Sequence, residues 1–128
     1  MGHVGKTLRT PLRQVRHLGA SHGGTTDAWR VHVTSAALVP LTIAFVWLML
    51  SLLHKDYNGV RAELGRPLPA IVLLLFTLVG VYHMQIGMRS IILDYARGRA
   101  RDWALIVNAC FASALGLAYV YATLRIGL

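Results

Sequence analysis

The chain has 128 residues, of which 55% are hydrophobic and only 14% are charged. Charged residues usually make up about a quarter of a soluble domain, so this composition argues against a disordered chain and against an ordinary soluble domain. The formal net charge of +8 would also suit a nucleic-acid-binding protein. The hydrophobic residues, however, are concentrated in three long runs, and this concentration predicts an integral membrane protein with a single domain over residues 1–128.

Residues 1–28 are polar, rich in Arg and Gly, and contain no acidic residue before Asp27. They lack the apolar core of at least about seven residues that a secretory signal needs, whereas an Arg-rich transit peptide is harder to dismiss. Gly19, Gly23 and Gly24 lower the helix propensity of this segment. We expect a basic cytoplasmic arm that lies along anionic lipid or along a soluble partner, with a solvated tail as the alternative.

Three runs contain no Asp, Glu, Lys or Arg: Val33–Leu53, Leu68–Met88 and Trp103–Leu124. Each has about 21 residues, which at about 1.5 Å per residue covers the hydrocarbon core of about 30 Å. Within a membrane, only a helix or a closed β-barrel pairs every backbone N–H and C=O group in a hydrogen bond. The alternating strands of a barrel are absent from this sequence, so the three runs are predicted to be helices. Pro40, inside the first run, is expected to bend its helix. The sequence predicts an all-α fold with transmembrane helices over about residues 33–53, 68–92 and 103–124.

The Lys and Arg residues predict the orientation, because three spans place the N-terminus and the second loop on the same side. Nine of these residues lie on that side: Lys6, Arg9, Arg13, Arg16, Arg30, Arg89, Arg97, Arg99 and Arg101. Four lie on the other: Lys55, Arg61, Arg66 and Arg125. The positive-inside rule therefore places the N-terminus in the cytoplasm, or in the matrix if the membrane is mitochondrial.

His83 lies inside the second run, where a polar side chain is costly and therefore informative. Gly80 and Gly87 border it on the same helix face, and the face continues to Ser90 and Asp94. Glycines beside an imidazole leave a flat slot that suits a porphyrin. Equally, the glycines could allow close helix packing, with His83 hydrogen-bonded across the interface.

A second histidine is needed if His83 binds a six-coordinate b haem, since both axial ligands lie at one depth on facing helices. His32 and His54 lie at opposite ends of the first run, and we expect His83 roughly 10 Å or more deeper than His32. The chain is therefore expected to supply one axial ligand, and a second subunit the other.

The remaining features favour a subunit of a larger assembly. No loop exceeds about 15 residues, so there is no soluble catalytic domain, and Cys110 is the single cysteine. Ala114, Ala118 and Ala122 repeat at four-residue spacing, as do Ala112 and Gly116, which would give small surfaces for helix contact unless the pattern is ordinary transmembrane composition.

Three stretches resemble the small membrane-anchor subunit of succinate dehydrogenase. In HMQIGMRSIILDYAR, His83–Arg97, a histidine is followed eleven and twelve positions on by Asp-Tyr, as in that family. DAWRVHVTSAALVPL, Asp27–Leu41, is similar to the family's entry into its first helix. TPLRQVRHLGASHGGT, Thr10–Thr25, resembles the N-terminal arm of the alphaproteobacterial and mitochondrion-like members. Together with three spans and this length, the resemblance covers nearly the whole chain.

The resemblance implies the D-type cytochrome b anchor of a four-subunit succinate:quinone oxidoreductase in a bacterial inner membrane, with the mitochondrial inner membrane as the less favoured place. The implied partners are a flavoprotein that oxidises succinate, an iron–sulfur subunit, and a second cytochrome b anchor. The two anchors would hold haem b between them and bind ubiquinone. Electrons from succinate would pass to the quinone.

For haem b, the resemblance implies that His83 is an axial ligand of the iron. The propionates would then point to the cytoplasmic side, where Arg30, His32 and Arg89 could balance their charge. The family commonly has an arginine where this chain has His32, and that arginine helps to hold a propionate. In this chain His32 or Arg30 could take the role of that arginine.

For the quinone, the resemblance implies Tyr95 and Asp94. The phenol would donate a hydrogen bond to a quinone carbonyl, and Asp94 would either relay protons or pair with Arg97 or Arg99.

Other classes remain as alternatives. An anchor of fumarate reductase would run the same chemistry with a different quinone preference, such as menaquinone. A small transporter or channel subunit would use Asp94, His83 and Asn108 as a polar path. A scaffold would bind no haem at all.

Overall fold

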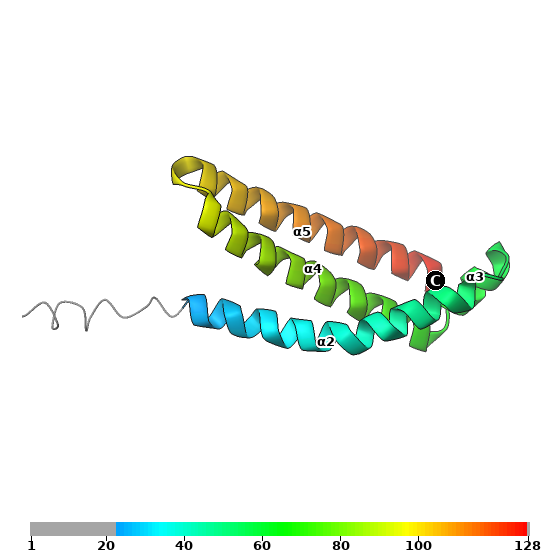
Figure 1. Ribbon diagram of the computed structural model, residues 1–128. Coiled ribbons are helices and arrows are strands. Elements are labelled where there is room, and N and C mark those ends of the chain that lie inside the picture. The colour runs from blue at the N-terminus through cyan, green and yellow to red at the C-terminus, as the bar shows by residue number, and fades with distance from the viewer. Residues whose placement is uncertain (1–22, 128) are drawn as a thin grey trace, which may run out of the picture.

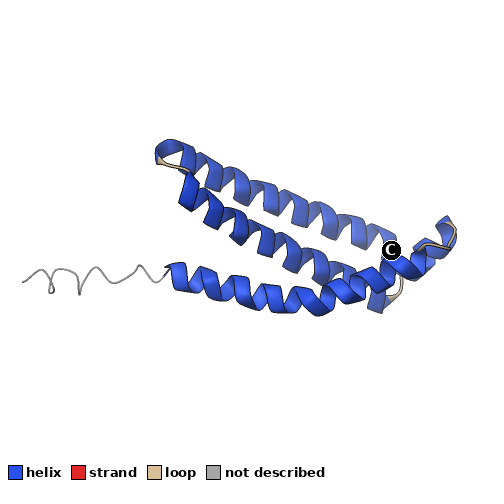
Figure 2. Ribbon diagram, in the orientation of Figure 1, coloured by secondary structure: helices blue, strands red, loops and turns tan. Residues whose placement is uncertain are grey.

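The computed structural model describes residues 23–127, and in this range it contains four helices and no strand (Figures 1 and 2). The helices are α2 (Gly23–Leu52), α3 (Tyr57–Leu64), α4 (Pro67–Tyr95) and α5 (Gly98–Gly127). The predicted all-α fold is confirmed. Most of the predicted basic arm, and with it most of the stretch Thr10–Thr25, lies outside the described residues.

Three of these helices, α2, α4 and α5, are long and apolar enough to cross a membrane, as predicted. They have 30, 29 and 30 residues, about 45 Å each by helical rise, so their ends extend past a hydrocarbon core of about 30 Å. α2 begins at Gly23, well before the predicted span, and the expectation that Gly23 and Gly24 would not be helical is wrong. Each glycine costs only about 1 kcal/mol in a helix, which a long apolar remainder outweighs.

α4 is the central helix of the three, with α2 packed on one side and α5 on the other (Figure 1). Within the described range, no Cα atom of α2 lies within 8 Å of one in α5. α2 changes direction part-way along its length (Figure 1), and Pro40, which lacks the N–H for one helical hydrogen bond, lies inside it. The N-terminal end of α2 and the α4–α5 turn are at one end of the bundle, and α3 is at the other.

Few side chains are enclosed by this arrangement. The buried hydrophobic residues of the described chain are Leu48, Pro69, Ile86 and Ala112, one or two from each long helix. Phe45 of α2 and Phe76 of α4 stack with their ring centroids 4.3 Å apart. Large side chains elsewhere point outward, which suits a helix bundle whose outer surface meets lipid or other subunits.

The small residues of α5 divide between two faces. Ala112 is buried and Gly116 half-buried, whereas Ala114, Ala118 and Ala122 are exposed. The first pair therefore serves packing within this chain, and the second set leaves a narrow, smooth surface toward the outside.

α3 lies in the loop between the first two spans and was not predicted from the sequence. Its N-terminus is capped by Asp56, whose Oδ1 accepts a hydrogen bond from the Gly59 N–H at 3.0 Å. Glu63 near its C-terminus accepts a hydrogen bond from Lys55 at 2.8 Å and forms an ion pair with Arg66 at 3.2 Å. An eight-residue helix is marginal by itself, so these contacts with flanking residues account for it.

The Glu63 contacts predict a pH dependence of α3. The hydrogen bond from Lys55, assisted by the charge of Arg66, lowers the pKa of Glu63 despite an opposing effect of burial. A carboxyl whose pKa is lowered on folding stabilises the fold above its unfolded pKa, and this contribution is lost as the pH falls through the folded pKa. We therefore expect Glu63→Gln to speed amide hydrogen exchange in α3 about two- to fivefold at pH 7.

Hydrogen–deuterium exchange of the reconstituted protein would measure this effect, with Asp102→Asn, near the start of α5, as the control. At acidic pH the variant and the parent should exchange alike. Equal exchange at pH 7 would show that α3 does not depend on the Glu63 contacts.

Candidate functional site

His83 is half-buried on α4 and makes a side-chain contact with α2. Its Nδ1 lies 2.8 Å from Oγ1 of Thr34. The same Oγ1 lies 2.8 Å from the carbonyl oxygen of Arg30 and 3.1 Å from that of Val31. Carbonyl oxygens only accept, so the single hydroxyl proton is directed to them and Oγ1 accepts from the imidazole. This arrangement favours the tautomer with the proton on Nδ1, which leaves the lone pair on Nε2.

His83 lines an open groove between α2 and α4, with a volume of about 490 Å³. Apart from His83 the groove is lined by α2: Ser35, Leu38, Val39, Thr42 and Ile43. Within the described chain no hydrogen bond reaches Nε2. An imidazole that is held through one nitrogen, and whose other nitrogen makes no hydrogen bond, is able to bind a metal ion through that second nitrogen.

The two glycines that border His83 have different surroundings. A Cβ atom at Gly80 would lie 4.0 Å from Cδ2 of Leu38, whereas one at Gly87 would meet nothing within 4 Å. Gly80 therefore lies where α4 packs against α2, as the packing interpretation predicted. Gly87 leaves open surface beside the helix, and the slot interpretation stays a prediction.

The expected depth difference between His32 and His83 is wrong. His83 contacts Thr34, which is two residues, or about 3 Å of helical rise, from His32. The two histidines differ instead in direction, because two residues turn a helix by about 200°. Thr34 faces α4, while His32 is exposed and its Nδ1 donates to the carbonyl of Ala28 at 2.9 Å. His32 therefore points away from the side of α2 that contacts His83.

Two of the three predicted propionate cations meet at an acidic residue that the sequence did not single out. Asp27 lies 3.6 Å from Arg30 of α2 and 3.5 Å from Arg89 of α4, with each distance joining a guanidinium nitrogen to a carboxylate oxygen. The carboxylate thereby joins the two helices near their ends. His32 takes no part in this cluster. The i,i+3 spacing of Asp27 and Arg30 was the only signal in the sequence.

Asp94 and Tyr95 are the last residues of α4, at the same end of the bundle as Asp27. Both are exposed, Tyr95 to 85%. By helical rise they lie about 16 Å from His83 along the axis. The turn that follows includes Gly98 with a φ of +58°, a conformation that side chains disfavour, and leads directly into α5.

Asp94 differs from the other carboxylates of the chain. Asp27, Glu63 and Asp102 form ion pairs, and Asp56 caps α3. Within the described range Asp94 has neither an ion pair nor a hydrogen bond, so the predicted pairing with Arg97 or Arg99 is not formed. A free carboxylate beside a free phenol is available to a molecule that binds at this end of α4.

The polar path that a transporter would need is not formed in this chain. Asn108 of α5 is buried and donates to the backbone carbonyl of Gln85 at 2.9 Å. It therefore contacts α4 from the side opposite to Thr34 and His83, since α2 and α5 lie on different sides of α4. Asn108, His83 and Asp94 are separate sites.

Comparisons with known proteins agree with this arrangement. The model of the succinate dehydrogenase/fumarate reductase transmembrane subunit family matches residues 6–116. This chain belongs to that family. The succinate dehydrogenase hydrophobic membrane anchor subunit of Paracoccus denitrificans is 36% identical over 119 residues, which cover 93% of this chain and 92% of the relative. The corresponding subunit of Rickettsia bellii is 24% identical, covering 90% and 93%. No solved structure matches the chain.

The predicted family is thus confirmed, and the chain is a membrane-anchor subunit of succinate dehydrogenase, part of an oxidoreductase complex in a membrane. The match from residue 6 extends over the N-terminal residues outside the described range as well as over most of the three spans.

The Asn108 contact predicts a packing role in this anchor. Asn108→Ala removes one hydrogen bond between α4 and α5, which in membranes is worth about 0.6 kcal/mol on average and at most about 1.7 kcal/mol. We expect a loss of stability of this size in a mixed-micelle unfolding titration, with electron transfer from succinate to quinone unchanged. Ser113→Ala is the control, because the Ser113 hydroxyl bonds only within its own helix. A large loss of electron transfer in an intact Asn108→Ala complex would instead place Asn108 on a functional path.

Proposed function

We propose that this anchor, in a bacterial inner membrane, holds haem b through His83 and forms part of a ubiquinone-reduction site with Tyr95 and Asp94. The observation that carries the proposal is the fixed imidazole of His83, bonded to Thr34 through Nδ1 and free at Nε2. A flavoprotein, an iron–sulfur subunit and a second cytochrome b anchor would complete the enzyme. Electrons from succinate would reduce the quinone, which would then leave the complex.

The residues around His83 suit a haem shared with another subunit. Haem b, when bound, would take up and pass on single electrons. Thr34 would orient the imidazole by accepting a hydrogen bond from its Nδ1–H, which is the kind of outer contact that most metal-bound histidines make. The groove at His83 is open and lined almost wholly by α2, so the remaining wall and the second axial ligand would come from the other anchor.

The cluster of Arg30, Arg89 and Asp27 would receive the haem propionates. Two guanidinium groups and one carboxylate leave one positive charge at this end of the α2–α4 interface. Arg30 also supplies the carbonyl to which the Thr34 hydroxyl donates, so the same turn of α2 serves the ligand and the cluster. His32 is exposed on another side of α2. It would contact a propionate only if the haem extended around that helix.

The free side chains at the end of α4 support the quinone site. The Tyr95 hydroxyl would donate to a quinone carbonyl, a bond that strengthens as the oxygen gains negative charge on reduction. Asp94, which pairs with no cation in the described chain, would supply or relay protons. This end of the bundle is the one predicted to face the cytoplasm, where electrons would arrive from the iron–sulfur subunit.

A related function is a fumarate reductase anchor, because the family model includes both enzymes. The relatives named above are succinate dehydrogenase subunits, which favours succinate oxidation over fumarate reduction. Extraction of the co-purifying quinone and its identification by mass spectrometry would distinguish ubiquinone from menaquinone.

His83 and Thr34 can be tested together in the purified complex. His83→Ala should abolish the low-spin haem spectrum. Thr34→Val keeps the shape of the side chain but removes the hydroxyl, so we expect haem affinity to fall about 10- to 100-fold. Thr34→Ser should retain most of the affinity. Thr42→Val, in the same groove, is the matched control and should leave the spectrum unchanged.

These variants separate the proposal from a packing role. If His83→Ala left an assembled complex with an unaltered reduced haem spectrum, His83 would not be a ligand. If Thr34→Val and Thr42→Val behaved alike, the Thr34 contact would serve helix packing only.

Tyr95→Phe tests the quinone site. Loss of one hydrogen bond to a developing negative charge costs about 1.5–3 kcal/mol, so we expect quinone reduction to slow about 10- to 100-fold. Succinate oxidation with a soluble artificial acceptor, and the haem spectrum, should stay unchanged. Tyr82→Phe, on the same helix, is the control. Unchanged quinone turnover and inhibitor sensitivity in Tyr95→Phe would remove Tyr95 from the site.

A further inference from the structure

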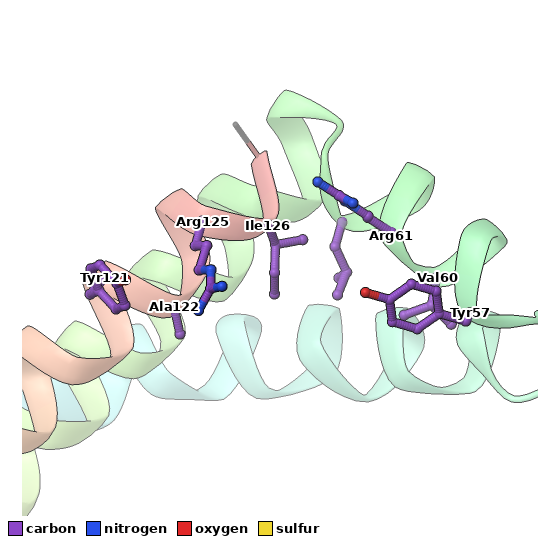
Figure 3. Close-up of a pocket in the computed structure, with 8 residues that line it drawn as sticks. Tyr57, Val60, Arg61, Tyr121, Ala122, Arg125 and Ile126 are labelled. Carbon is purple, nitrogen blue, oxygen red and sulfur yellow. The ribbon is translucent and has the colours of Figure 1, made fainter.

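A second groove lies at the other end of the bundle, between α3 and the last turns of α5, and has a volume of about 490 Å³ (Figure 3). Its lining includes two arginines, two tyrosines and apolar side chains, among them Tyr57, Arg61, Leu64, Tyr121, Arg125 and Ile126. Figure 3 shows that Arg61 and Arg125 come from opposite walls, with Ile126 between them, and that the Tyr57 hydroxyl points into the groove. Neither the haem nor the quinone proposal uses this end of the chain.

The charge of this groove is not neutralised within the described chain. Four cations lie on this side of the membrane, and two of them, Lys55 and Arg66, pair with Glu63. Arg61 and Arg125 have no ion pair or side-chain hydrogen bond with any described residue, and both line the groove. Among the described residues that line it there is no carboxylate. The groove therefore presents two positive charges to whatever occupies it.

The position of the groove indicates a membrane-boundary site. Arg125 lies in the last turn of α5, and α3 lies in the loop that joins the outer ends of α2 and α4. Tyrosine is typical of this boundary, because its ring is apolar and its hydroxyl is polar. Below the arginines the exposed face of α5 is apolar, with Leu117 72% and Leu124 51% exposed.

We propose that this groove binds the headgroup of an anionic phospholipid. Arg61 and Arg125 would contact the phosphate from two sides, since guanidinium groups match phosphate oxygens in geometry and charge. The Tyr57 hydroxyl would donate to a further oxygen, and the acyl chains would lie along the apolar face of α5. A soluble phosphate would use only the cations, whereas a lipid uses the cations and the apolar wall together.

The test uses the complete, purified complex, delipidated and then titrated with phosphatidylglycerol or phosphatidylcholine, with bound lipid counted by native mass spectrometry. We expect retention of phosphatidylglycerol over phosphatidylcholine. In the double variant Arg61→Gln/Arg125→Gln this preference should fall roughly 30-fold, since each cation near a membrane surface contributes about fivefold. Arg66→Gln is the matched control, because Arg66 lies in the same loop but pairs with Glu63. Unchanged succinate oxidation and an unchanged haem spectrum would show that the variants assemble.

Three outcomes would overturn the proposal. Equal binding of the two lipids, or equal loss in the Arg66 variant, would show that the arginines of the groove do not select an anionic lipid. Displacement of the lipid by millimolar inorganic phosphate would show a site for soluble anions. Protection of Arg61 from guanidine-modifying reagents in a fully delipidated complex would show that another subunit covers the groove.

Discussion

The hydrocarbon core of a membrane contains no water, so each polar side chain within it must find its partner in protein. In this chain two such side chains link the three spans. His83 bonds to Thr34 and joins α4 to α2, and Asn108 bonds to the Gln85 carbonyl and joins α5 to α4. Because few apolar side chains are buried, these directional contacts, together with the stacked Phe45 and Phe76, account for how the helices are rotated against one another.

The contact of His83 with Thr34 confirms the interhelical hydrogen bond and is compatible with the second interpretation, haem ligation. An interhelical hydrogen bond and an axial haem ligand use different nitrogens of one imidazole, and the bond at Nδ1 is what would hold Nε2 in a fixed direction. Gly80 packs against Leu38 while Gly87 faces open surface, so the two glycines of one helix have different surroundings. A chain that encloses so little by itself would need residues of another chain to complete any cofactor site.

The two ends of the bundle use carboxylates in the same way. At one end Asp27 lies between Arg30 and Arg89, and at the other Glu63 lies between Lys55 and Arg66. Each carboxylate holds together elements that are distant in sequence or separated by a turn. Within the described residues the charges without an ion pair are Asp94, Arg97 and Arg99 at one end, where Asp94 is followed by Tyr95, and Arg61 and Arg125 at the other. These are the groups that an outside molecule, whether quinone or lipid, can engage without breaking an existing contact.

The number of spans, the helical class and His83 as the central polar residue could all be predicted from the sequence, because hydropathy and the spacing of Asp94 and Tyr95 after His83 are local properties. The short helix α3 could not, since its stability depends on the Asp56 cap and on ion pairs of Glu63 with residues at both flanks. The depth of His83 relative to His32 was also mispredicted. Counting helical rise from the ends of the apolar runs gives a position along each helix separately. It does not give the position of one helix relative to another along their axes. Thr34 lies 49 residues from His83, and their contact exists only because packing sets the register of α2 against α4.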